Sequence, residues 1–200
     1  ADSPPLTQVN GRLEFSESGI NAREVNAQFL GGPAAFSLVT RADGTIVASA
    51  RGAANLAQLP RYWDGPLLRR VSGSTAWQGT LSGARKKPLT LSVESQLTGA
   101  AIDLPAPLGK NATEIRPLRV EWVIDADPGR RGDSIKVSLG PSIGGEIRRR
   151  LEDGRWMVKR GVLSFDEPAV MPERDEIAVI GSLPYLDADR WRALLAGDED

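Results

Sequence analysis

The chain has 200 residues, no histidine and no cysteine, and its 25 basic and 26 acidic side chains leave a net charge of −1. This composition excludes catalysis by a histidine base or a thiolate, as well as disulfides and cysteine-ligated metals. A carboxylate pair or a metal site made of carboxylates alone remains possible. The balanced charge provides no overall attraction to nucleic acid or to an anionic membrane. The chain contains 21 glycines and 14 prolines, 35 in total, which predicts many turns between short strands.

Apolar and polar residues alternate with a period of two through most of the first fifty positions, which is the pattern of half-buried strands. Residues 9–51 are predicted to form a four-stranded antiparallel meander, with one hairpin turn at Asp43-Gly44. Residues 55–59 are expected to form a short helix that Pro60 ends. The stretch 60–73 is predicted to be an irregular connection.

The alternation resumes after residue 74. The stretch 97–104 is ambiguous, with a helical turn as one interpretation, and a proline-rich loop follows it through Lys110. One helix is predicted near the C-terminus, where Asp187 is a suitable N-cap and Trp191 and Leu194 share a face. The further predicted strands cover residues 75–81, 89–95, 118–124, 135–139, 143–151, 156–165 and 177–182.

These elements predict a mainly β protein, an antiparallel meander of about eleven short strands with one C-terminal helix, built as a curved sheet or as a sandwich. We expect an N-terminal meander over 1–60 and a second β region with the helix over 61–200, joined in one continuous sheet-based unit. No stretch is long and apolar enough for a membrane span, and the N-terminus has no signal-peptide pattern. A processed chain or an excised piece is therefore expected.

The densest carboxylate cluster holds Asp125, Asp127 and Asp133, with Arg130 and Arg131 beside them. Hard cations such as calcium bind several oxygen ligands, so such a loop can contribute to a metal site. Aspartate and glycine are also common turn residues, and the favoured interpretation is a solvated hairpin tip without a metal.

The basic residues gather in two runs, 148–150 and 86–87, either of which could contact phosphates or lipid head groups. On a strand Arg149 faces away from its two neighbours, so the first run is not one patch. An exposed or edge strand protected by charge is the favoured interpretation.

No nucleophile motif and no phosphate-binding loop is present. The adjacent acidic pairs at 152–153 and 166–167 point to opposite faces of a strand, which favours surface charge over a catalytic pair. No catalytic residue, no metal ligand and no cofactor is predicted, and the chain is expected not to be an enzyme.

Five stretches resemble the AsmA-like superfamily, in particular its YhdP-type proteins of Gram-negative bacteria, in an order that extends over nearly the whole chain. The most specific is Leu-Pro-Ala-Pro-Leu-Gly-Lys, which ends at Lys110. The five stretches are VNGRLEF (9–15) with SGI (18–20), LGGP (30–33), VSGSTAW (71–77), LTGAAIDLPAPLGK (97–110) and LPYLDADRW (183–191).

The resemblance implies a non-enzymatic piece of a longer periplasmic protein, anchored in the inner membrane by a segment absent from this sequence. It implies phospholipid transport between the inner and outer membranes and a role in envelope permeability, with acyl chains and the rest of the parent chain as partners. Alternatives are a structural or protein-interaction β module and, less favoured, a carboxylate-based glycan hydrolase. The predicted groove-lining residues are Leu13, Phe15, Phe36, Leu38, Trp77, Leu81, Leu91, Val93, Val120, Trp122 and Ile124.

Overall fold

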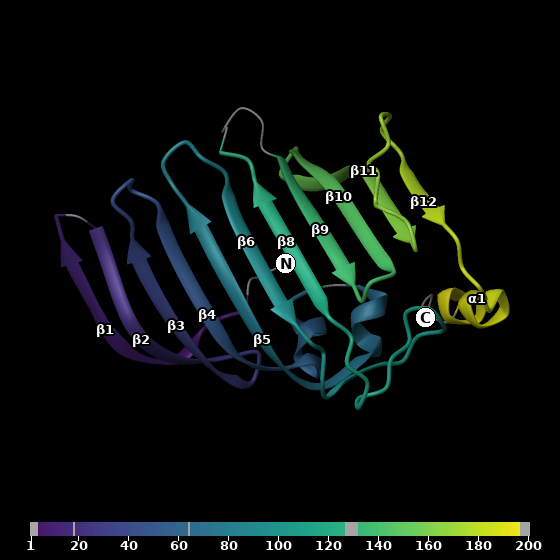
Figure 1. The fold of residues 1–200 in the computed structure, drawn as a ribbon, viewed down its shortest axis with the longest axis horizontal. Coiled ribbons are helices and arrows are strands. Elements are labelled where there is room, and N and C mark those ends of the chain that lie inside the picture. Colours follow the sequence, from purple (N-terminus) through teal and green to yellow (C-terminus); the bar gives the residue numbers. More distant parts are fainter. Residues whose placement is uncertain (1–3, 18, 64, 127–131, 197–200) are drawn as a thin grey trace.

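A computed structural model describes residues 4–17, 19–63, 65–126 and 132–196 of the chain. It contains twelve strands, two 3₁₀ helices and one α-helix (Figure 1). The 3₁₀ helices are η1 (Leu56–Arg61) and η2 (Pro66–Arg70), and the α-helix is α1 (Ala188–Ala196). The strands are β1 (Thr7–Ser16), β2 (Gly19–Phe29), β3 (Gly32–Thr40), β4 (Ile46–Asn55), β5 (Val71–Gly83), β6 (Leu89–Ser95), β7 (Ala100–Ile102), β8 (Leu118–Ile124), β9 (Gly132–Leu139), β10 (Ile143–Glu152), β11 (Arg155–Phe165) and β12 (Ile177–Gly181).

The strands form one open sheet whose spatial order follows the chain from β1 to β12, except that β7 pairs only with the start of β5. All pairs are antiparallel apart from β11 and β12, which are parallel. Figure 1 shows the strands side by side, with the helices near the lower ends of the strands. The predicted mainly β, antiparallel fold with a C-terminal helix is confirmed, and of the two predicted arrangements the structure has the sheet and not the sandwich.

The hairpin turn predicted at Asp43-Gly44 joins β3 to β4. Gly44 donates a backbone hydrogen bond to the carbonyl of Arg41 (2.9 Å), and its φ of 78° lies in the left-handed region that glycine adopts without strain. The Asp43 carboxylate accepts hydrogen bonds from the backbone N–H and the hydroxyl of Thr45, and these bonds lower its pKa.

The connection between β4 and β5 differs in detail from the sequence prediction. The short helix is the 3₁₀ helix η1, and Pro60 does not end it but lies inside it, one residue before its last residue, Arg61. The Asn55 side chain caps η1 by accepting a bond from the N–H of Ala57 (3.1 Å). The stretch 97–104, ambiguous in the sequence, contains strand β7.

The predicted N-cap of α1 is confirmed, since Asp187 accepts a hydrogen bond from the N–H of Arg190 (3.0 Å). The helix is also attached to the loop after β7, because the indole N–H of Trp191 donates to the carbonyl of Ala106 (3.1 Å). None of the described helices is both long and apolar enough to cross a membrane.

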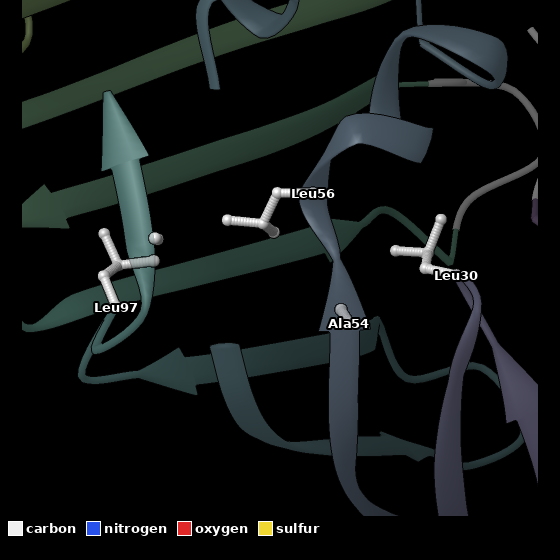
Figure 2. Close-up of a cluster of buried hydrophobic side chains, with 5 residues drawn as sticks. Leu30, Ala54, Leu56 and Leu97 are labelled. Atoms are coloured by element: carbon white, nitrogen blue, oxygen red, sulfur yellow. The ribbon is translucent and has the colours of Figure 1, made fainter. Parts of the chain in front are cut away.

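A compact cluster of buried side chains lies at the end of the sheet near η1 (Figure 2). Its members are Leu30 from the β2–β3 turn, Ala54 from β4, Leu56 from η1, and Leu97 and Ala100 from the segment after β6. Residues on both sides of position 60 therefore contribute to one core. Trp77, Phe29, Leu118 and Leu139 pack around this cluster from the sheet itself.

Candidate functional site

The strand register places a continuous row of apolar residues and glycine across eleven neighbouring strands, from one edge of the sheet to the other. Residues paired across neighbouring strands point to the same face. We call this row the central row. Its members, in spatial order, are Leu13, Ala22, Leu38, Ala48, Leu81, Leu91, Trp122, Ile135, Ile147, Gly161 and Ile177.

A second row lies two residues along each strand from the central row, or three on β2, where the register shifts between Ala22 and Val25, and it is on the same face. We call the face that holds both rows the apolar face. The second row extends from β2 to β12 and consists of Val25, Phe36, Ala50, Gly79, Val93, Val120, Val137, Gly145, Leu163 and Val179.

All eleven groove-lining residues predicted from the sequence lie on the apolar face. Eight belong to the two rows, and Phe15, Trp77 and Ile124 lie two residues further along the same strands. The prediction missed the part of this face formed by β9 to β12. The signal was present, because the alternation of Ile135 with Val137 is as regular as that of the chosen residues.

The middle of the apolar face is open. Leu81 lies on a central strand, between Ala48 and Leu91, yet 37% of its surface is exposed. Apolar residues of a sandwich core are covered by a facing sheet. The apolar residues are still more exposed at both edges of the sheet, where Phe15 and Ile177 lie.

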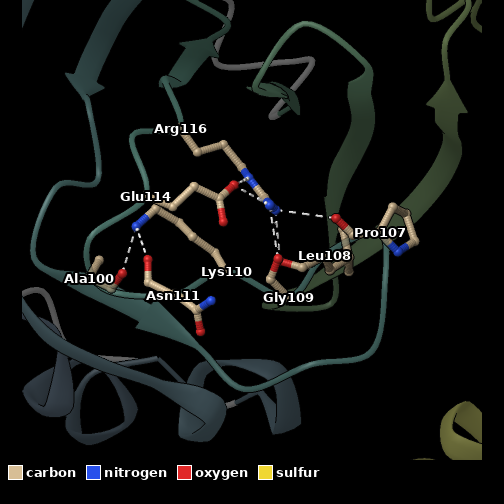
Figure 3. Close-up of polar contacts among 8 residues, drawn as sticks. All are labelled: Ala100, Pro107, Leu108, Gly109, Lys110, Asn111, Glu114 and Arg116. Carbon is tan, nitrogen blue, oxygen red and sulfur yellow. Dashed lines mark hydrogen bonds and ion pairs between the residues drawn. The ribbon is translucent and has the colours of Figure 1, made fainter.

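One end of the apolar face is closed by the buried cluster and by the loop that carries the Leu-Pro-Ala-Pro-Leu-Gly-Lys motif (Figure 3). Lys110 is buried in this loop, where its ammonium donates to the carbonyls of Ala100 (2.7 Å) and Asn111 (2.8 Å). Burial removes water from the charged form and so lowers the pKa of Lys110, although the nearby Glu114 opposes this shift.

Arg116 stabilises the other half of the same loop. Its guanidinium donates to the carbonyls of Pro107 (3.2 Å), Leu108 (3.1 Å) and Gly109 (2.9 Å), and it also pairs with Glu114 (2.6 Å). These bonds satisfy loop carbonyls that have no strand partner. The family-like motif therefore has a structural role here: it builds the closed end of the apolar face.

The opposite face of the sheet is polar over its central strands. Its pairing row includes Ser37, Ser49, Thr80, Ser92 and Glu121. A hollow of about 590 Å³ lies on this polar side and is lined largely by small and polar residues, which do not suit hydrocarbon chains. A second hollow, of about 650 Å³, is lined mostly by alanine, glycine and proline together with Trp77, which lies on the apolar face, so this hollow does not belong to the polar face alone.

The first hollow also contains two carboxylates, Glu24 and Glu94. Hydrogen bonds from Gln78 (3.0 Å) and from Arg119, which is also ion-paired with Glu94, lower the pKa of Glu94. A glycosidase general acid needs a raised pKa. The geometry therefore does not favour the glycan hydrolase among the alternatives.

Two sequence interpretations are corrected by the structure. Asp133 is not at a solvated tip: its carboxylate is fully buried in β9 and ion-paired with Arg149. The run 148–150, expected on an exposed or edge strand, is exposed at Arg148 and Arg150, but the strand is not an edge, since β10 lies between β9 and β11. Asp127, Arg130 and Arg131 lie outside the described residues, and those described contain no cluster of three acidic side chains able to hold a metal.

The fold and the site define a class: an open, single-layer β-sheet with one polar face and one apolar face that extends from edge to edge. The family model described as YhdP protein matches residues 1–199, and the chain belongs to the YhdP family. This finding confirms the resemblance seen in the sequence. No curated protein and no solved structure matches the chain.

Proposed function

We propose that the chain is a non-enzymatic lipid-binding segment whose apolar face holds phospholipid acyl chains in the periplasm, as part of a longer protein that moves phospholipid between the inner and outer membranes. The observation that supports this most is the uncovered central row. An apolar strip that continues through eleven strands and remains open at Leu81 needs an apolar partner. Membership of the YhdP family is consistent with such an envelope role.

The dimensions suit the proposal. At about 4.8 Å between neighbouring strands, a row through eleven strands extends roughly 48 Å. One acyl chain occupies about 15 Å, half of the roughly 30 Å hydrocarbon core of a bilayer. The apolar face is therefore long enough for a chain to lie across several strands and to shift along the row without leaving apolar surface.

Neighbouring residues of β5 provide a matched test. Leu81 and Thr80 are both exposed, but they lie on opposite faces of the same strand. We expect Leu81→Glu to weaken binding of a fluorescent phospholipid by at least about tenfold, because a carboxylate placed against acyl chains loses its water. Thr80→Glu adds the same charge on the polar face and should leave binding unchanged. Equal effects of the two variants, or absence of binding by the unchanged chain, would contradict the proposal.

The periplasmic location can be tested in cells because the chain contains no cysteine. A single Ser37→Cys change places a thiol on the polar face. We expect a membrane-impermeant maleimide to label a parent protein that carries this change more strongly than the unchanged parent protein, in Gram-negative cells whose outer membrane alone has been permeabilised. Labelling that requires rupture of the inner membrane would refute a periplasmic location.

A second candidate function, a protein-interaction β module, is favoured by the open sheet edges. Strand β1 is exposed along its whole length, and β12 pairs only on one side. Open edges of this kind bind additional strands through their free backbone groups. Crosslinks from β1 or β12 to strands of another segment of the parent chain, without bound lipid, would favour this function over lipid binding.

A further inference from the structure

One charged cluster lies on the otherwise apolar face, and neither the fold nor the acyl-chain proposal accounts for it. It is formed by Trp122, Asp133, Arg149 and Trp156, one residue from each of the four neighbouring strands β8 to β11. Asp133 and Arg149 are directly paired in the register, and Ile124 is the partner of Asp133 on β8. Apart from Trp122, which belongs to the central row, the cluster therefore lies beyond that row, at the end of the face opposite the closed one.

Asp133 fixes the orientation of Arg149. The carboxylate is fully buried and accepts bonds from Nε of Arg149 (2.9 Å), from its Nη2 and from the indole N–H of Trp122 (2.7 Å). The remaining guanidinium nitrogen, Nη1, has no hydrogen-bond acceptor among the described residues, and 23% of the arginine side chain is exposed.

Two indole rings flank the guanidinium. Its carbon lies 5.0 Å from the ring centre of Trp156 and 6.0 Å from that of Trp122, which are cation–π distances. The rings and the bidentate carboxylate together hold the arginine at one position before any ligand arrives. Trp156 is itself exposed, and indole rings are favoured where hydrocarbon meets a polar layer.

We propose that Arg149 binds the phosphate of the phospholipid whose chains lie on the apolar face. The inference rests on the proposed function and adds an orientation to it: the head group lies at the hairpin-tip end, near Trp156, and the chains point towards the closed end near Leu97. The N–H groups of Nη1 supply charge-assisted bonds to a phosphate oxygen. Because Asp133 partly neutralises Arg149, the arginine binds a phosphodiester weakly enough for the lipid to be released again.

The test compares three probes: dihexanoyl-phosphatidylglycerol below its micelle concentration, dihexanoylglycerol, which has the same chains without phosphate, and inorganic phosphate. We expect the phosphate-bearing lipid to bind about tenfold more tightly than the neutral one, the effect of roughly one charge-assisted hydrogen bond. Inorganic phosphate alone should neither bind measurably nor compete, because it lacks the chains.

The double variant Asp133→Asn with Arg149→Gln removes both charges without leaving the buried carboxylate unpaired. It should bind the two lipids equally, while Arg149→Lys, which keeps a charge but loses the planar fork, should retain part of the preference. Arg150→Gln, on the opposite face, is the control and should change nothing. Circular dichroism confirms that each variant is folded.

An unchanged preference for phosphate in the double variant would overturn the inference, and so would Arg149-dependent binding of inorganic phosphate as tight as that of the lipid. Failure of the unchanged chain to bind either lipid would instead refute the proposed function. The two failures are therefore distinguishable.

Discussion

Lys110 is the clearest case of a single residue whose charge is set by the fold. Its burial lowers its pKa, so over the pH range between the lowered value and the ordinary one near 10.4 the unfolded chain binds more protons than the folded chain. The free energy of unfolding contributed by Lys110 therefore rises with pH through that range. Below the folded-state pKa, Lys110 is charged in both states, and the full free-energy cost of burying that charge applies.

We expect Lys110→Met to lower the free energy of unfolding by about 1–2 kcal/mol at pH 7, because the carbonyls of Ala100 and Asn111 lose their donor. The gap between the unchanged chain and the variant should widen as the pH rises towards the ordinary lysine pKa near 10.4, since only the former titrates at this position. Urea unfolding at several pH values measures the gap, and the other lysines and tyrosines cancel in the comparison. Parallel stability curves would contradict the buried charge.

At the residue scale, the sequence predicts which face of the sheet a side chain lies on better than it predicts which residue that side chain contacts. The period-two alternation sufficed to select Leu81 and ten others for one face, because side-chain direction in a strand is a local property. It could not show that Asp133 is buried, since its partner Arg149 lies sixteen positions later and meets it only through the β9–β10 register. A carboxylate beside glycine looks like a turn residue until such pairing is known.

At the scale of elements, β12 is the least protected edge of the sheet. Its sequence, IAVIG, contains no charge and no proline, the features by which natural proteins protect edge strands. We expect the isolated chain to self-associate through this edge, and we expect Val179→Lys to weaken the association at least about tenfold in sedimentation velocity. Ile115→Lys is the matched control, because Ile115 is 66% exposed and Val179 67%, but Ile115 lies in a loop. Equal effects would show that general hydrophobic contact, not strand pairing, drives association.

The elements themselves were largely predictable, because alternation and glycine turns act over a few residues. The exception is β7, a strand of three residues that pairs with Val71–Gly73 of β5. This pairing joins separate parts of the chain, and local patterns do not encode it.

At the scale of the whole molecule, the unsettled question was whether the apolar sides of the strands face a second sheet. Alternation is the same in an open sheet and in a sandwich, so the sequence left both open. In the structure the strand order follows the chain to β12 without folding back, so no described strand forms a second layer over the central row. Five of the ten buried hydrophobic residues of the described chain are concentrated instead in the cluster at the closed end.

This concentration leads to our proposal that residues 1–60 and 61–200 unfold as one unit. Leu56 lies in a cluster that contains Leu30 and Ala54 from the first part and Leu97 and Ala100 from the second. We expect Leu56→Ala to lower the free energy of unfolding by about 2–4 kcal/mol. Hydrogen exchange should accelerate equally in β3–β4 and in β5–β7, because both lose the same support.

Leu81→Ala is the matched control for this prediction. It deletes the same atoms from the open part of the apolar face, where no second layer covers them, and should cost less than about 1 kcal/mol. If Leu56→Ala accelerated exchange on only one side of position 60, the two parts would be separate folding units joined by η1. If Leu81→Ala cost as much as Leu56→Ala, the central row would be covered in solution, and the open face on which lipid binding depends would not exist.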